Sequence, residues 1–225
     1  MPDNYAATVL YKADIERELY NRATGVDAKD YILVDSLCVE LSRCLGVDCS
    51  SFQDLRYMHI QNDACIPIIS KYIPQFTNIG FALELITQQF WRKGNRECSN
   101  FLERWTLELK ANGRLSKVAE NTLDNAFVKI QDKRKQDFLI GLICEKDAFP
   151  FTMEMLGRWK IEAALSIIIE RLEVDTIKTS AITALGKYKD LSLLPYIEPF
   201  INRTKAGERK AAARAVKQIK NLRIQ

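Results

Sequence analysis

The chain has 225 residues, of which 47% are hydrophobic, so it can form one extended domain or two small ones and bury about 70% of its unfolded surface. Nine Gly and six Pro are few against the roughly 12% of average usage, which favours long helices and argues against a turn-rich β fold. The formal net charge of +4 and the pI of about 8.7 are modest and argue against a dedicated nucleic-acid-binding domain, whose pI is expected to exceed about 9.

Apolar residues recur at helical spacing along the whole chain, as in Val34, Leu37 and Leu41. No stretch has the pattern of a β-hairpin, and Asn112-Gly113 is typical of a helix end followed by a new start. Helices are predicted near residues 5–23, 30–45, 62–73, 77–92, 96–111, 115–131, 135–144, 150–159, 162–173, 177–188, 192–203 and 207–222.

An internal repeat lies in the C-terminal part of the chain. LGRWK at residues 156–160 returns as LGKYK at residues 185–189, a shift of 29 residues. The helices that follow the two motifs share their apolar positions at the same shift, and a further shift of about 31 residues extends the repeat to residue 216. The match weakens upstream, where the glycine is lost. Stacked helical hairpins produce such a period, because one hairpin cannot bury its apolar face alone.

The segment IKTSAITALGKYKDLSLLPYIEPFI (177–201) resembles a HEAT repeat. It has a basic residue, alanines where helices pack closely, a Leu-Gly, an acid near the turn and a Leu-Pro that opens the second helix: Lys178, Ala181, Ala184, Leu185, Gly186, Asp190, Leu194 and Pro195. The resemblance is clearest over 148–219 and only periodic over 96–147. Pro199 departs from the pattern and should kink or shorten the second helix, because it removes a backbone hydrogen bond.

This resemblance implies an all-α fold, a right-handed α-solenoid of stacked antiparallel helical hairpins. It implies a single domain over 1–225, with divergent helices over 1–95 and repeats of about 29–31 residues over 96–225. In HEAT-like solenoids the second helices line a concave face, which most often holds another macromolecule. Scaffolds, adaptors, bilin lyases and bacterial alkylpurine DNA glycosylases share such folds, so the fold alone does not choose a function.

Cysteine and histidine usage gives no metal or redox site. Cys38, Cys44 and Cys49 lack zinc-knuckle spacing, and the single His59 has no second histidine, so we expect no metal. We interpret the cysteines as small core residues with reduced thiols. No signal-peptide pattern opens the chain and no apolar run approaches 18 residues, which favours a cytoplasmic protein without membrane contact.

Positive charge concentrates in the C-terminal half: residues 1–112 hold 12 Lys+Arg against 15 Asp+Glu, and residues 113–225 hold 21 against 14. The helix near 207–222 places cations on one half and alanines on the other. Cations also recur at the repeat turns, where they should line up in space. The predicted basic face is Arg158, Lys160, Lys187, Lys189, Arg209, Lys210, Arg214, Lys217, Lys220 and Arg223. The same charges also suit a solenoid cap and a helix C-terminus.

Three functions stay open. The leading hypothesis is a non-catalytic protein-binding module, an adaptor, assembly factor or inhibitor, of which an immunity protein that neutralises a toxin is one form. The second is a nucleic-acid-binding solenoid that uses the basic C-terminal helix, since clustered cations displace counterions from a phosphate backbone. The third is a HEAT-like enzyme of the DNA glycosylase kind. The sequence leaves the partner and the oligomeric state open.

An enzyme of the third kind needs aromatic residues to hold a base and a carboxylate to stabilise a cationic sugar. Trp105 with Glu108 and Trp159 with Glu162 have helical i, i+3 spacing, but neither pair matches a family motif. Gly-rich phosphate loops that follow a strand are absent from the sequence. We therefore expect no catalytic activity and no cofactor.

Overall fold

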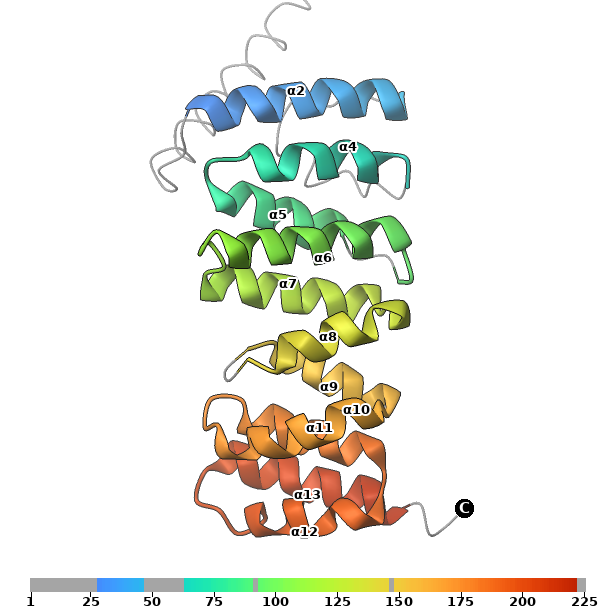
Figure 1. Ribbon diagram of the computed structural model, residues 1–225, viewed down its shortest axis with the longest axis vertical. Helices are drawn as coiled ribbons and strands as arrows, with labels where there is room; N and C mark the ends of the chain where they lie inside the picture. Colours follow the sequence, from blue (N-terminus) through green and yellow to red (C-terminus); the bar gives the residue numbers. More distant parts are fainter. Residues whose placement is uncertain (1–27, 47–62, 91–92, 146–147, 222–225) are drawn as a thin grey trace, which may run out of the picture. The chain divides into compact units, whose positions relative to one another are not determined.

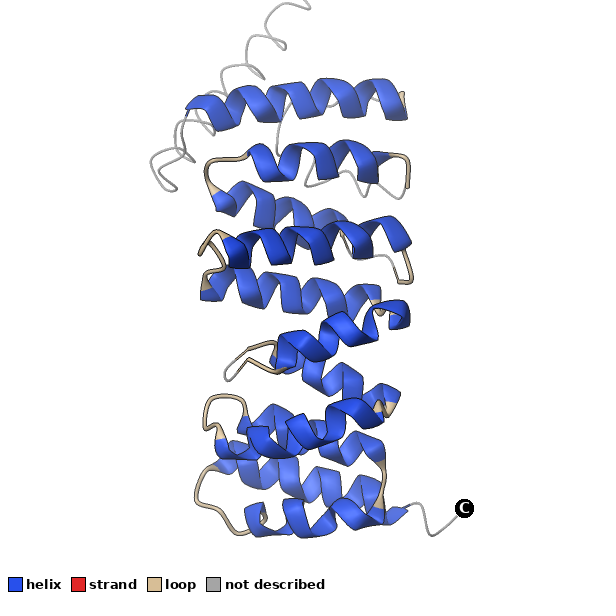
Figure 2. Ribbon diagram, viewed as in Figure 1, coloured by secondary structure: helices blue, strands red, loops and turns tan. Residues whose placement is uncertain are grey.

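The structure is a computed structural model that describes residues 28–46, 63–90, 93–145 and 148–221. These residues form eleven α-helices and five short 3-10 helices and contain no strand (Figures 1 and 2). The all-α prediction is thereby confirmed, whereas the solenoid arrangement stays a prediction.

Most helices begin and end within a few residues of the predicted ranges, but α12 ends at Ile197, well before the predicted end near residue 203. The helix predicted near 5–23 lies outside the described residues. The α-helices are α2 (Ala28–Leu45), α4 (Cys65–Tyr72), α5 (Ile79–Gln89), α6 (Arg96–Ala111), α7 (Lys117–Ile130), α8 (Gln136–Ile143), α9 (Pro150–Trp159), α10 (Glu162–Glu170), α11 (Lys178–Tyr188), α12 (Leu194–Ile197) and α13 (Ala206–Lys220). The 3-10 helices are η1 (Ile73–Gln75), η2 (Lys133–Lys135), η3 (Arg171–Glu173), η4 (Leu191–Leu193) and η5 (Glu198–Phe200).

The chain forms two compact units, Met1–Phe90 and Trp91–Gln225. Their boundary lies close to residue 95, after which the repeats are predicted to begin. The single domain predicted for 1–225 stays a prediction. In the first unit α2 packs against α4. The backbone N–H groups of Thr77 and Asn78 each donate to the buried Asp30 carboxylate at 2.7 Å. The first turn of α2 thus holds the segment that starts α5.

In the second unit α11 packs between α9 and α13, and α7 packs against α9 (Figure 1). A Cβ atom added at Gly157 would lie 2.5 Å from the Ala184 carbonyl oxygen, and one added at Gly186 would lie 2.6 Å from the Ala215 Cβ. No side chain fits at either position without moving a helix. The glycine of the repeated motif therefore makes the same close contact between α9 and α11 and between α11 and α13.

Hydrogen bonds across the repeat also join helices of the second unit. The N–H groups of Phe151 and Thr152 donate to the buried Asp124 carboxylate on α7 at 2.8 and 2.6 Å, so α7 caps the start of α9. The buried Arg171 guanidinium donates to the carbonyl groups of Ile143 and Cys144, where α8 ends.

Two local predictions have different outcomes. The second helix that contains Pro199 is shortened as predicted, because α12 ends at Ile197 and the chain continues as η5. The interpretation of the cysteines as core residues is wrong for Cys44 and Cys144, which are exposed because they lie where α2 and α8 end and the chain leaves the packed surface. Cys38, Cys65 and Cys98 are buried, and Cys49 and His59 lie outside the described residues.

Candidate partner-binding surface

The ends of α9 and α11 place cations from two repeats at equivalent positions. Lys160 and Lys189 are the C-cap residues of these helices, and both have the left-handed backbone conformation with φ of 57°. Arg158 and Lys187 lie in the last turns of the same helices. Cations are favourable at these helix ends because the carbonyl groups there carry partial negative charge.

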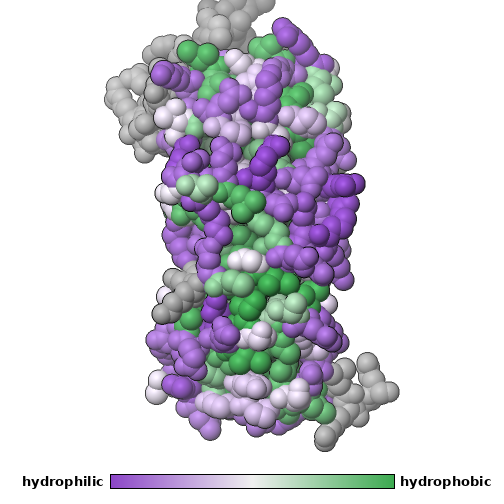
Figure 3. All heavy atoms as spheres, in the orientation of Figure 1, coloured by the Kyte–Doolittle hydropathy of each residue, from purple (hydrophilic) through white to green (hydrophobic). Residues whose placement is uncertain are grey.

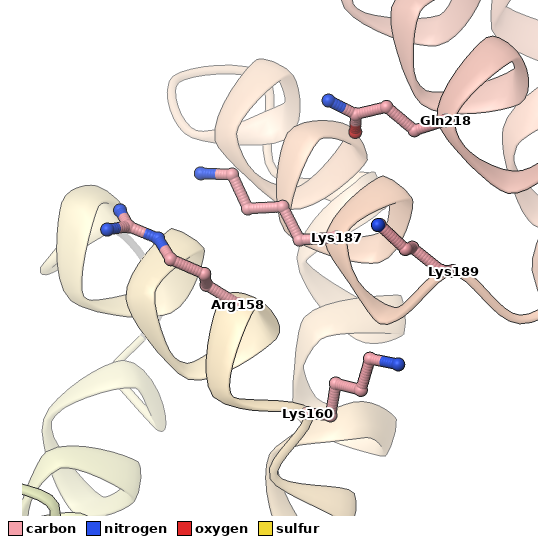
Figure 4. Close-up of a pocket in the computed structure, with 5 residues that line it drawn as sticks. All are labelled: Arg158, Lys160, Lys187, Lys189 and Gln218. Atoms are coloured by element: carbon pink, nitrogen blue, oxygen red, sulfur yellow. The ribbon is translucent and has the colours of Figure 1, made fainter.

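These cations line a surface pocket of about 460 Å³, which we call the basic pocket. It is lined by Arg158, Lys160, Lys187, Lys189 and Gln218. The side chains come from α9, α11 and α13 and from the turns after α9 and α11 (Figure 4). In this view Arg158 and Lys187 run side by side in one direction, whereas Lys160 points the opposite way. Four of the predicted site residues thus line one pocket, and their role in binding stays a prediction.

The basic pocket carries more positive than negative charge. The Lys187 ammonium is 2.7 Å from a Glu154 carboxylate oxygen, and these side chains are 21% and 22% exposed. Arg158, Lys160 and Lys189 are exposed, and their side chains form no ion pair with any residue that the structure describes. Three cations of the pocket therefore remain available to an anion.

The basic residues of α13 lie apart from the pocket lining. Its buried side is formed by Ala212, Ala215 and Ile219, so the predicted amphipathic character is confirmed. The opposite side exposes Arg209, Lys210, Arg214, Lys217 and Lys220, and Arg223 lies outside the described residues. Lys220 is 3.3 Å from Glu198, and the Arg209 guanidinium donates to the Arg203 carbonyl group at 3.3 Å. Gln218 of α13 also lines the pocket, but it was not among the predicted site residues.

The basic cluster at Lys133–Lys135 is occupied by contacts within the second unit. Arg134 pairs with Asp132 at 2.7 Å, and Lys135 forms an ion pair with Glu103. The Lys133 ammonium lies over the half-buried Trp159 ring, 5.8 Å from its centroid. This cluster therefore does not extend the basic pocket.

The aromatic and acidic pairs considered for glycosylase chemistry do not converge. Trp105 is only 4% exposed and stacks on Phe101, whereas Glu108 on the same helix is exposed. The half-buried Trp159 ends α9 and the exposed Glu162 starts α10, so this pair does not share a helix face. Tyr188 is buried, and its hydroxyl donates to the Ile161 carbonyl group at 2.6 Å. These rings serve mainly as packing residues.

The buried carboxylates of Glu120 and Asp124 on α7 were not predicted as functional residues. Burial raises the pKa of Asp124 to about 6, against the lowering effect of hydrogen bonds from Thr152 and Phe151, and the negative charge of Glu120 raises it further. A Glu120 oxygen accepts from the Phe149 N–H at 3.4 Å and pairs with Lys117 at 2.9 Å. Both carboxylates hold the start of α9 and do not line the basic pocket.

An apolar surface on α8 and α10 was also missed. Only Ala164 and Ile168 of α10 are buried, although most of this helix is apolar. The half-exposed residues of the two helices, which we call the apolar surface, are Phe138, Ile140, Leu165, Ile167 and Ile169. α8 and α10 pack against each other, and hydrophobic residues gather over them on the face in Figure 3. The signal in the sequence is that apolar residues make up most of both helices.

Comparison with known proteins assigns no family to the chain: no protein-family model and no curated protein matches it. Within the described ranges, no group of three or more His, Cys, Asp and Glu side chains is arranged to hold a metal ion. None of the described helices combines the length and the apolar character that a membrane crossing requires.

Proposed function

We propose that the chain is a cytoplasmic, non-catalytic protein-binding module of the HEAT-like α-solenoid kind, acting as an adaptor, assembly factor or inhibitor. α7, α9, α11 and α13 would be the first helices of successive repeats, and α8, α10 and α12 the second helices. The proposal is supported by the recurring close contacts at Gly157 and Gly186 and by the packing of α11 between α9 and α13.

The observation that carries the choice of a protein partner is the half-exposed apolar surface on α8 and α10. Apolar residues make up most of both helices, and Leu165, Ile167 and Ile169 of α10 stay only half-buried. Contiguous exposed apolar side chains are typical of protein interfaces, whereas a nucleic-acid backbone is bound mainly by cations. The partner would therefore present apolar side chains to Leu165 and Ile169, which lie one helical turn apart on α10.

Nucleic-acid binding through α13 is the second candidate. Lys210, Arg214 and Lys217 have i, i+4 and i+7 spacing, so they share one face, and they form no ion pair within the described part of the chain. Three such cations can follow a phosphate backbone. The net charge of +4 supports this candidate only weakly.

The test is capture of partners by the tagged chain from its native lysate, with and without nuclease, followed by affinity measurement with the purified captured protein. Leu165→Glu should weaken that affinity at least about tenfold, because it buries a charge in the interface. Ser166→Glu adds the same charge at the next, exposed position of α10 and should leave it unchanged.

Two outcomes would refute the protein-binding proposal. One is a captured protein whose affinity is the same for Leu165→Glu and wild type. The other is captured material that is released by nuclease and lost in the triple variant Lys210→Ala, Arg214→Ala and Lys217→Ala, with a steep salt dependence. The second outcome would establish the nucleic-acid alternative.

A further inference from the structure

We propose that the basic pocket binds a phosphate monoester, carried either on a phosphorylated side chain of a protein or on a small molecule. This site is separate from the apolar surface on α8 and α10 and does not rest on the function proposed for it.

The repeat brings two equivalent pairs of cations together. Arg158 and Lys187 occupy one position of the motif, and Lys160 and Lys189 occupy another. The contact of Gly157 with α11 leaves no room for a side chain between the helices, so the two turns lie close enough to line one pocket. The two C-cap lysines also share the same backbone conformation. The arrangement is therefore set by backbone packing as well as by the long side chains.

The charges of the pocket are unbalanced. Its lining has four cations, and Glu154 pairs with one of them, Lys187. The ends of α9 and α11 add about half a negative charge each, which opposes an anion but offsets only part of the excess. Holding like charges around one space is unfavourable until a counter-charge enters. A bound anion would relieve this repulsion.

A phosphate monoester fits these donors better than a single carboxylate. It carries up to two negative charges near neutral pH and three terminal acceptor oxygens, and the pocket lining offers three cations that lack an ion pair, of which Lys160 and Lys189 follow the ends of α9 and α11. Gln218 lines the pocket with an amide that can donate a further hydrogen bond. The volume of about 460 Å³ is in the range of small-molecule sites and leaves room for the group that carries the phosphate.

A discrete phosphate group is favoured over a nucleic-acid strand. A strand needs a track of cations along its backbone. Lys210, Arg214 and Lys217 of α13 do not line the basic pocket, and the cluster at residues 133–135 is held in contacts within its own unit. Nucleic-acid binding is therefore an outcome that the test must detect.

The test is calorimetric titration of the full chain at low salt with four probes: phenyl phosphate, phenyl sulfate, a short phosphoserine peptide and a twelve-nucleotide thymidine strand. Phenyl sulfate has the same shape as phenyl phosphate but a single charge. We expect phenyl phosphate to bind more tightly than phenyl sulfate. The double variant Lys160→Ala and Lys189→Ala should weaken phenyl phosphate binding at least about tenfold, because it removes two charge-assisted donors.

The matched control is Lys210→Ala with Lys217→Ala, which removes the same charge from the exposed side of α13 and should change binding less than about twofold. Equal weakening by both double variants would mean an unspecific charge effect and would overturn the proposal. So would undetectable binding of both phosphate monoester probes, or a thymidine strand that binds the pocket more tightly than the monoesters do.

The same titrations distinguish the two sources of the phosphate. Tighter binding of the phosphoserine peptide than of phenyl phosphate would assign the pocket to a modified protein, and the reverse order would assign it to a small molecule. Leu165→Glu leaves the pocket intact and should not alter phosphate binding. Failure of the phosphate site and failure of the protein-binding function would therefore give different results.

Discussion

Two junctions of the second unit join helices at a similar sequence separation by different chemistry. α9 meets α11 through Gly157, where the backbones approach too closely for any side chain. α7 meets α9 through Asp124 and Glu120, which accept hydrogen bonds from the backbone at the start of α9. The difference shows that the repeat spacing does not require one kind of contact. Steric exclusion fixes the first junction, and buried hydrogen-bonded carboxylates fix the second.

The largest expected effect on stability comes from a substitution at the steric junction of α9 and α11. Gly157→Ala should lower the free energy of unfolding by about 3 kcal/mol or more, because the added methyl group meets the Ala184 carbonyl oxygen at 2.5 Å and α11 must move. Chemical denaturation measures the change. Gly141→Ala on α8 is the control, because its Cβ would meet nothing within 4 Å, and it should stabilise slightly through helix propensity. Equal stability of the two variants would contradict the steric account.

The next largest effect on stability comes from a substitution at the carboxylate junction of α7 and α9. Asp124→Asn keeps the size of the side chain but replaces one acceptor oxygen by an amide that cannot accept the N–H of Phe151 or Thr152. We expect a loss of about 2 kcal/mol in the free energy of unfolding near pH 5. Asn125→Asp, at the exposed neighbouring position of α7, should change it far less. A loss that is no larger in the first variant would mean that Asp124 does not cap α9.

The pH dependence of stability is a second test of the junction of α7 and α9. The pKa of Asp124 is about 6 in the folded chain and near its ordinary value of 3.8 in the unfolded chain, so between these values the folded chain binds more protons. Its contribution to stability is therefore complete below about pH 4 and is lost as the pH rises through 6. The slope is at most about 1.4 kcal/mol per pH unit.

The measurement compares wild type and Asp124→Asn by denaturation at several pH values, since other carboxylates titrate as well. The pKa values of Asp132 and Asp175 are lowered, and these groups contribute a slope of opposite sign in both proteins. The difference between the proteins should shrink as the pH rises from 4 to 6. A difference that grows over this range would mean that the hydrogen bonds outweigh burial and hold the pKa of Asp124 below its ordinary value.

The two junctions show which features of the fold could be predicted from the sequence. The helices were predictable because their apolar residues have a helical period. The glycine junction was visible because sterics force the same residue to recur at Gly157 and Gly186. This recurrence also predicted that Arg158, Lys160, Lys187 and Lys189 line up in space, and all four line the basic pocket. Asp124 was not identified, because its partners are backbone groups 27 and 28 residues away and any residue could supply them.

The apolar surface and Gln218 were missed for related reasons. The apolar composition of α8 and α10 is visible in the sequence, but whether neighbouring helices cover these residues is a property of tertiary packing. Gln218 lines the pocket only because α13 packs on α11 at Gly186, and an amide within a basic helix has no distinctive pattern.

The smallest expected effect on stability comes from the ion pair that connects α9 and α11 beside the basic pocket. Lys187 on α11 reaches back to Glu154 on α9 at 2.7 Å, and both side chains are partly exposed, so the ion pair should contribute at most about 1 kcal/mol. Glu154→Gln should therefore hardly change the free energy of unfolding.

Glu154→Gln also removes the acid that neutralises one of the four pocket cations, so phenyl phosphate should bind several-fold more tightly. The control Glu170→Gln removes an exposed acid of α10 and should leave the affinity unchanged. A gain in affinity that is equal in both variants would mean that net charge, rather than the arrangement around Lys187, controls the pocket.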